Sequence, residues 1–209
     1  MKAIVFVDVQ NDFVKGGKLA FKYPERDNVP DVIKFAKECR AKGYALYATA
    51  DTHEPTQTGT FSGKPESGYL ATLEGRKLPV EHCIAGTKGH EIVKGLVKDE
   101  NGDVIIPQGH IVDKPTFGSF DLLQTIDQDF VVWANVGQNL EYGLKEPLEE
   151  IIVCGYCTSI CVMANAVMLR AKYPNVKITV RADLCGDVDE ESHRAALKVL
   201  RMQQIDVIE

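Results

Sequence analysis

Residues 151–161 have the sequence Ile-Ile-Val-Cys-Gly-Tyr-Cys-Thr-Ser-Ile-Cys. The apolar start of this stretch predicts a buried strand, and the glycine after it predicts a turn. Residues 159–172 then show the spacing of apolar side chains that is typical of a helix. A strand that leads through a short turn into a helix is part of a βαβ unit. The stretch therefore predicts an α/β fold with a parallel sheet.

Further apolar runs rich in Val and Ile occur along the chain, as expected for parallel strands that are covered on both faces. They lie at 3–7, 45–49, 109–113, 176–180 and 205–208. Helical spacing appears between them at 30–43 and at 189–202. The alternation of strand and helix extends the βαβ pattern over most of the chain.

The chain has 209 residues and a mass of 23.1 kDa, which fits a single domain over 1–209. Residues 52–88 are rich in Pro, Gly, Thr and Ser, and a loop of that length in a compact domain is usually functional. Residues 127–147 form a possible insertion, in which 130–134 fit either a strand or part of the insertion.

The composition excludes several classes of protein. Hydrophobic residues make up 44% and charged residues 26%, which is the balance of a globular protein. The net charge of -6 argues against nucleic acid or an anionic membrane as a partner, and no apolar run approaches the roughly 18 residues of a membrane span. The six cysteines are sparse, so we expect reduced thiols in a cytoplasmic enzyme. A homo-oligomer is possible, and the sequence leaves this open.

Polar side chains follow the ends of four predicted strands. Asp8 ends the first strand, and Asp51 with His53 ends the second. Lys114 follows the strand at 109–113, and Cys161 lies just beyond the turn that starts at Gly155. Because ligands bind beyond the carboxyl ends of parallel strands, we expect these side chains to converge on one site.

Cys161 lies near the start of a predicted helix, where the helix N-terminus stabilises a thiolate. Free backbone N–H groups at that position can also form an oxyanion hole. One alternative is a small buried hydrophobic residue. Another is a metal cluster of Cys154, Cys157 and Cys161, although Cys154 is expected to point into the core and no fourth thiol has suitable spacing.

Asp8 closes an apolar strand, where a carboxylate without a partner would be costly. Lys114 lies between an apolar pair and Pro115, which suggests a fixed, partly buried position. Each of the two side chains is therefore a suitable partner for the other.

Asp51 and His53 are two residues apart in extended chain, so both side chains can face the same side and bind one metal ion. His82 lies in the same long loop, and Glu74 precedes it by eight residues. The alternative is a hydrogen-bonded loop with solvated histidines. No role is assigned to His90, His110 and His193.

These residues resemble the isochorismatase-like cysteine hydrolases, and within them the nicotinamidase branch. The matching stretches occur in family order and span most of the chain. They are Val5-Phe-Val-Asp8-Val-Gln-Asn-Asp-Phe13, Asp51-Thr-His53, Glu81-His82-Cys83, Asp113-Lys114-Pro-Thr-Phe117 and Gly155-Tyr-Cys-Thr-Ser-Ile-Cys161-Val162.

The resemblance implies a three-layer α-β-α fold with a six-stranded parallel sheet. It implies a catalytic triad of Cys161, Asp8 and Lys114, and a cis peptide between Tyr156 and Cys157. The oxyanion hole would consist of the backbone N–H groups of Cys157 and Cys161.

The resemblance also implies a divalent metal ion, often zinc, with Asp51, His53 and His82 as ligands. Many nicotinamidases have a further histidine where this chain has Thr60. Some members use a glutamate upstream of the last histidine instead, and Glu74 resembles that arrangement.

The implied activity is hydrolysis of a small amide, nicotinamide, with Phe13 and Tyr156 as substrate contacts. A tryptophan that lines the pocket in some members is absent near His82, where Leu78 and Pro79 stand, and the only tryptophan, Trp133, lies in the possible insertion. Two alternatives therefore stay open. They are a related hydrolase of a carbamoyl or ureido compound, and a non-catalytic small-molecule binding protein.

Overall fold

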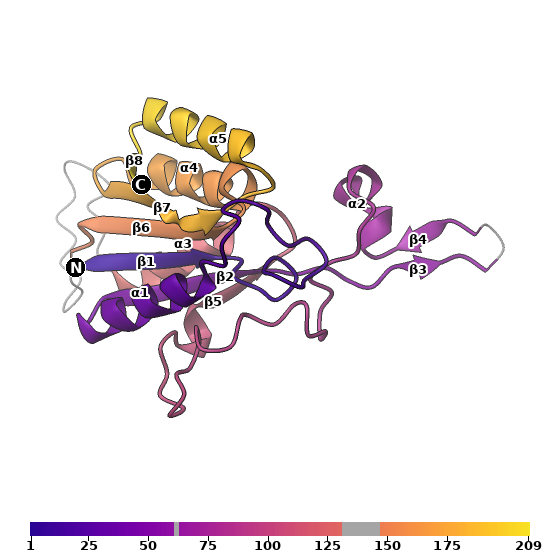
Figure 1. Cartoon of the computed structure of the whole chain (residues 1–209), viewed down its shortest axis with the longest axis horizontal. Coiled ribbons are helices and arrows are strands. Elements are labelled where there is room, and N and C mark those ends of the chain that lie inside the picture. The colour runs from indigo at the N-terminus through magenta and orange to yellow at the C-terminus, as the bar shows by residue number, and fades with distance from the viewer. Residues whose placement is uncertain (61–62, 131–146) are drawn as a thin grey trace.

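The computed structural model describes residues 1–60, 63–130 and 147–209. Six parallel strands form the central sheet in the order β5-β2-β1-β6-β7-β8, with helices packed around it (Figure 1). The strands are β1 (Lys2–Val7), β2 (Ala45–Asp51), β5 (Ile111–Lys114), β6 (Glu150–Tyr156), β7 (Lys177–Gly186) and β8 (Asp206–Ile208). The predicted three-layer fold with a six-stranded parallel sheet is confirmed.

The long helices are α1 (Val29–Ala41), α3 (Phe120–Asp129), α4 (Met163–Lys172) and α5 (Glu190–Met202). A proline in the first turn starts α1, and the Asp189 side chain caps α5 by accepting a hydrogen bond from Ser192 N–H. The helix predicted over 159–172 begins as a π-helical turn, Thr158–Val162, before α4. The sequence analysis missed α3, which Ser119 caps through Leu122 N–H.

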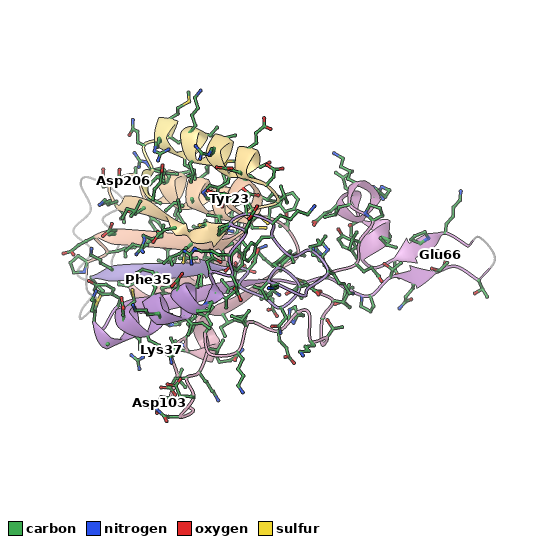
Figure 2. The ribbon with its side chains drawn as sticks, viewed as in Figure 1. Tyr23, Phe35, Lys37, Glu66, Asp103 and Asp206 are labelled. Atoms are coloured by element: carbon green, nitrogen blue, oxygen red, sulfur yellow. The ribbon has the colours of Figure 1, made fainter. Side chains whose placement is uncertain are left out.

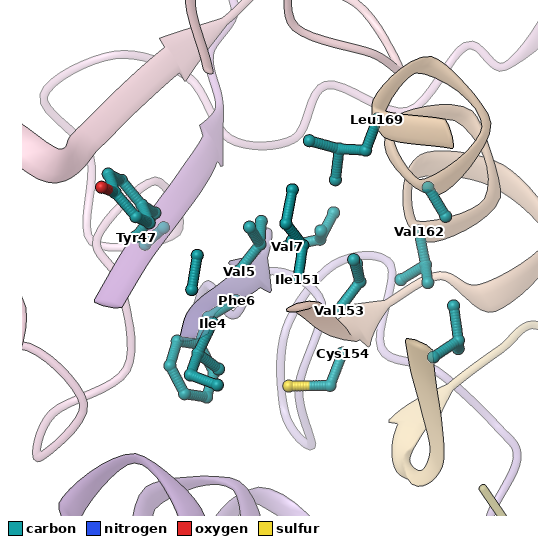
Figure 3. Close-up of a cluster of buried hydrophobic side chains, with 14 of the residues drawn as sticks. Ile4, Val5, Phe6, Val7, Tyr47, Ile151, Val153, Cys154, Val162 and Leu169 are labelled. Carbon is teal, nitrogen blue, oxygen red and sulfur yellow. The ribbon is translucent and has the colours of Figure 1, made fainter. Parts of the chain in front are cut away.

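The core lies on both faces of the sheet. Phe6 contacts Phe35 of α1, with 6.3 Å between ring centroids, while the neighbouring Val5 and Val7 point toward the opposite face, where α4 lies (Figure 3). The residues of β1 from Ala3 onward are fully buried, which explains why this strand is apolar at every position rather than at alternate ones.

Part of the loop predicted over 52–88 extends away from the sheet, and we call residues 54–60 and 63–80 the projecting segment (Figure 1). It contains the antiparallel strands β3 (Gln57–Thr58) and β4 (Pro65–Ser67), a 3-10 turn over Tyr69–Ala71 and the short helix α2 (Leu73–Lys77). Figure 2 shows Glu66 on this segment, far from Phe35 and Asp206 of the main body.

Another 3-10 turn, Gln108–His110, leads into β5. The possible insertion at 127–147, with Trp133, lies almost entirely outside the described residues. All six cysteines are buried and free, as expected for reduced thiols. Within the described ranges, no helix is long and apolar enough to cross a membrane.

Candidate active site

The carboxyl ends of neighbouring strands bring the predicted polar residues together. Asp51 pairs with Lys114 in the register of β2 and β5, and Asp8 follows the adjacent strand β1. Lys114 Nζ lies 2.7 Å from Asp8 Oδ2, 3.5 Å from Asp51 Oδ1 and 3.6 Å from Cys161 Sγ. One buried ammonium group therefore contacts a thiol and two carboxylates that are distant in sequence.

Asp8 is fully buried and is held in place by Thr49. Thr49 Oγ1 donates to Asp8 Oδ1 at 2.7 Å, and the Asp8 N–H group donates to Thr49 O at 3.1 Å. Asp8 Oδ2 makes no hydrogen bond of regular geometry to any described residue, although it lies at ion-pair distance from Lys114. The position of Asp8 is fixed by one oxygen, while the other can accept a proton. The sequence analysis missed Thr49, whose signal was a hydroxyl in an apolar strand.

Burial and neighbouring charges shift the pKa values of this group. Burial raises the pKa of the Asp8 carboxyl group, and the Lys114 ammonium opposes that rise. Burial acts to lower the pKa of Lys114, but the charge of Asp8, followed by the effects of Cys161 and Asp51, outweighs it and raises the pKa. The raised pKa of Asp8 is suited to a group that takes up and releases a proton.

The thiol of Cys161 is only 6% exposed, and burial, followed by the charge of Asp8, raises its pKa well above 9. Burial and the charge of Asp8 oppose ionisation of Cys161 more than the Lys114 ammonium favours it, and stabilisation of a thiolate by the helix N-terminus stays a prediction. The raised pKa favours the thiol form, whose deprotonation would need a nearby base.

The turn before Cys161 has a constrained backbone. Gly155 has a φ of 126°, and a Cβ atom there would lie 2.1 Å from Val7 O of the adjacent strand, so only glycine fits. The peptide between Tyr156 and Cys157 is cis, as the resemblance implied. Asn165, which the sequence analysis missed, donates from Nδ2 to Cys161 O at 2.8 Å.

Asp51, His53 and His82 are buried, and one potential metal ligand atom of each lies within 4.8 Å of the others. His53 Nε2 lies 2.9 Å, and His82 Nε2 3.3 Å, from the same oxygen, Asp51 Oδ2. Val80 O lies 2.8 Å from His82 Nδ1 and can accept a hydrogen bond from an Nδ1–H group, which would leave Nε2 free as a ligand. One carboxylate and two imidazoles are a donor set that suits a divalent first-row metal ion.

Hydrogen bonds and neighbouring charges shift the pKa values of Asp51 and His82. Hydrogen bonds from His53 and His82 outweigh the opposing effect of burial and lower the pKa of Asp51. Burial lowers the pKa of His82, but the bond to Asp51 and the other acceptors reverse this and raise it. In the described part of the chain, the cysteines form no comparable group, so the alternative cluster of Cys154, Cys157 and Cys161 has no support.

Glu74 of α2 lies slightly farther out. Its Oε1 atom is 3.9 Å from both His53 Nε2 and His82 Nε2, and burial raises its pKa. Thr60, which occupies the place of a further histidine in many nicotinamidases, is exposed on the projecting segment. In the described part of the projecting segment, Glu74 is therefore the residue whose carboxylate lies near both imidazoles.

Two side chains that the sequence analysis did not assign support the imidazoles and Asp51. The buried Tyr69 ring lies 4.6 Å from His53 and 5.0 Å from His82 between ring centroids. Gln10 bonds both backbone groups of Asp51, accepting from its N–H at 2.8 Å and donating to its O at 2.9 Å. A polar residue just after an apolar strand was the only sequence signal for Gln10.

The predicted substrate contacts have different surroundings. Phe13 is 7% exposed and meets the His82 ring edge-on at 5.6 Å, so it lies beside the group of Asp51, His53 and His82. The Tyr156 side chain is fully buried, stacks on Phe21 at 4.6 Å and donates its hydroxyl to Asn28. A direct contact between Tyr156 and the substrate stays a prediction.

The unassigned histidines have structural partners. His90 Nε2 bonds Thr52 Oγ1 at 2.8 Å, and the His110 ring stacks on Tyr47 at 4.5 Å. His193 Nδ1 lies 2.9 Å from Thr158 Oγ1.

The isochorismatase domain profile matches residues 2–209, and this chain belongs to the isochorismatase family. Nicotinamidase of Escherichia coli K12 is 27% identical over 208 residues, covering 96% of this chain and 90% of that protein. The pyrazinamidase of Pyrococcus horikoshii in complex with zinc has a TM-score of 0.67 at 21% identity and covers 100% of this chain and 98% of the other. The nicotinamidase/pyrazinamidase of Bacillus subtilis has a TM-score of 0.69 at 20% identity, with 100% and 99% covered.

Family membership and these relatives define the class of protein as an amidohydrolase of this family. The chain is a hydrolase that acts on amide carbon–nitrogen bonds.

Proposed function

We propose that this protein is a nicotinamidase, which converts nicotinamide and water into nicotinate and ammonia through a thioester on Cys161. The observation that carries the proposal is the position of Lys114 Nζ, which lies 2.7 Å from the Asp8 carboxylate and 3.6 Å from Cys161 Sγ. The similarity to the nicotinamidase of Escherichia coli supports the choice of substrate.

The first half of the reaction forms the thioester. Asp8 accepts the proton of the Cys161 thiol while sulfur attacks the amide carbon, because the buried thiol is not ionised at rest. The carbonyl oxygen becomes an oxyanion bound by the N–H groups of Cys157 and Cys161, a type of contact worth about 3–4 kcal/mol of barrier. The intermediate then breaks its carbon–nitrogen bond, and the leaving nitrogen takes the proton from Asp8 as ammonia departs.

The second half hydrolyses the thioester. Asp8, now ionised, accepts a proton from water as the water oxygen attacks the thioester carbon. The carbon–sulfur bond breaks, the proton on Asp8 returns to the sulfur of Cys161, and the product leaves as the acid, which releases the second proton of the water to become nicotinate. Lys114 stays protonated throughout, because the negative charges around it raise its pKa. The positive charge of Lys114 stabilises the negative charge of Asp8 in one half-reaction and that of the departing sulfur in the other.

Asp51, His53 and His82, joined by Glu74, would hold a divalent ion, and we propose zinc. The two imidazole nitrogens and the carboxylate oxygen match the ligands that zinc prefers. When bound, the ion would act mainly as a template for the pyridine nitrogen of the substrate. Phe13, edge-on to His82, would supply an apolar wall for the ring of the substrate.

The test is ammonia release from nicotinamide and from a panel of small amides, together with metal analysis of the purified protein. We expect release from nicotinamide, and we expect Cys161→Ala to remain folded with no turnover. Release from carbamoyl or ureido compounds but not from nicotinamide would instead support the second substrate class. That class has one supporting observation, since no tryptophan lies near His82, where Leu78 and Pro79 stand instead. A Cys161→Ala protein with wild-type turnover would contradict the mechanism.

A further inference from the structure

The backbone turn that carries Cys157 and Cys161 is held from outside by Asp187, the residue that follows β7. Asp187 Oδ2 accepts a hydrogen bond from Ser159 N–H at 2.8 Å, and its Oδ1 accepts one from Ser159 Oγ at 2.8 Å. Ser159 lies midway between the two residues whose amides form the proposed oxyanion hole. The ends of β6 and β7 are neighbours in the sheet, with Tyr156 opposite Gly186, which brings Asp187 to this turn.

The carboxylate of Asp187 is itself rigidly placed. Its backbone N–H donates to Tyr23 O at 2.7 Å, and its carbonyl accepts from Tyr23 N–H at 3.1 Å and Lys22 N–H at 2.9 Å. Figure 2 labels Tyr23 on the main body. A neighbouring tie reinforces the same contact, because Thr158 Oγ1 donates to Gly186 O at 3.2 Å. The turn is therefore held by Asp187, whose own backbone is fixed by hydrogen bonds to Tyr23 and Lys22.

A carboxylate is unusual at the buried position of Asp187. Its side chain is fully buried, and none of the described lysines, arginines or histidines forms an ion pair with it. After burial, the charge of Asp187 is the next cause that raises the pKa of the Cys157 thiol, which reaches about 12. Burying a carboxylate without a cation is costly, and hydrogen-bond donors from the turn offset that cost.

We propose that Asp187 is a positioning residue that fixes the backbone amides of the oxyanion hole through Ser159; this inference rests on the proposed function. Asp187 affects the transition state, in which the amides of Cys157 and Cys161 bind the developing negative charge. It does not touch the substrate. Its loss should therefore lower kcat and leave KM nearly unchanged.

Asp187→Asn is the sharpest test, because an amide offers one acceptor oxygen where the carboxylate offers two. The carboxylate serves three donors, namely Ser159 N–H, Ser159 Oγ and Val188 N–H, so the asparagine must present its NH2 group to at least one donor. We expect kcat for nicotinamide to fall about ten-fold, less than the effect of deleting an oxyanion donor outright. KM should stay within about two-fold of the wild-type value.

A second readout reports the oxyanion site directly. Pyridine-3-carbaldehyde has no leaving group, so addition of the Cys161 sulfur to its carbonyl carbon stops at a thiohemiacetal. The carbonyl double bond becomes a single bond, the thiol proton passes to Asp8, and the oxygen occupies the oxyanion position. We expect the inhibition constant to rise in Asp187→Asn by the same factor by which kcat falls, since both depend on the same amides.

The matched control is Asp189→Asn, the same substitution two residues later. Asp189 accepts a hydrogen bond from Ser192 N–H at 2.7 Å at the start of α5, away from the turn that carries Cys157 and Cys161. Because asparagine caps a helix about as well as aspartate, this variant should keep its stability, and kcat and aldehyde inhibition should stay within about two-fold of wild type. If Asp187→Asn does not accumulate as folded protein, Ser159→Ala removes only the Oγ bond and should give a smaller, parallel change in both readouts.

Wild-type kcat and aldehyde inhibition in a folded Asp187→Asn or Ser159→Ala protein would overturn the inference and leave only a structural role. An increase in KM at constant kcat would overturn it as well. The outcome is separate from that of the proposed function, because a wild-type protein that releases no ammonia from nicotinamide refutes the function whatever the variants do.

Discussion

Removing the ammonium group of Lys114 should destabilise the protein in a way that depends on pH. Lys114→Met keeps a long apolar side chain and leaves the Asp8 carboxylate without its partner. The two groups are 2.7 Å apart and their side chains are 1% and 0% exposed. At an effective dielectric constant of about 20, their attraction is about 6 kcal/mol. Because desolvation offsets part of this, we expect the free energy of unfolding to fall by about 3–5 kcal/mol near neutral pH.

The pH dependence follows from Asp8. Without Lys114, burial raises the pKa of Asp8 still further above its value of about 4 in the unfolded chain. The folded variant then holds a proton that the unfolded chain has released. Its stability is therefore best preserved below about pH 4 and falls by about 1.4 kcal/mol per pH unit up to the raised pKa. The loss relative to wild type should be smaller at about pH 5 than at about pH 8.

Urea denaturation of wild type and Lys114→Met at these pH values measures the effect. The Asp8→Asn/Lys114→Met double variant should recover much of the loss, because no buried charge is then left unpaired. Lys37→Met is the matched control, since its pair with Glu100 is exposed and should contribute less than about 1 kcal/mol. A loss below about 1 kcal/mol that does not change with pH, or a double variant no more stable than Lys114→Met, would refute the reasoning.

Three further predictions use other parts of the site and fold. Asp8→Asn should abolish turnover yet speed alkylation of Cys161 by iodoacetamide, because the charge of Asp8 raises the pKa of that thiol; slower alkylation would count against the electrostatic account. His82→Ala should weaken zinc binding at least about ten-fold in a chelator titration and raise KM more than it lowers kcat, whereas unchanged zinc content would remove it from the metal site. Ser119→Ala should cost about 1 kcal/mol in thermal unfolding and leave kcat unaltered, since it loses only the cap on Leu122 N–H.

The strands were predictable from the sequence because parallel strands buried on both faces need continuous apolar runs. Those runs also predicted where Asp8, Lys114 and Cys161 would meet, since the carboxyl ends of parallel strands lie at one edge of the sheet. Helix α3 was missed, although Leu122, Leu123 and Ile126 have helical spacing and Ser119 supplies its cap.

The supporting residues could not be predicted, because their roles depend on the direction of a side chain rather than on spacing. Thr49, Tyr69 and Asp187 come from three different elements and reach the site only after the chain has folded. The depth of burial was equally hidden, and it raises the pKa of the Cys161 thiol. Sequence spacing thus predicts which groups meet, whereas their protonation depends on packing.

The proposed mechanism requires that Cys161 forms a covalent thioester with the substrate. Rapid acid quenching of the enzyme during turnover of nicotinamide, followed by peptide mass spectrometry, tests it most directly. We predict that one nicotinoyl group is attached to the peptide that contains Cys161, that it is lost on further incubation, and that Cys161→Ala does not acquire it. Continued turnover with an unmodified Cys161, or with the acyl group on another of the six cysteines, would contradict the account.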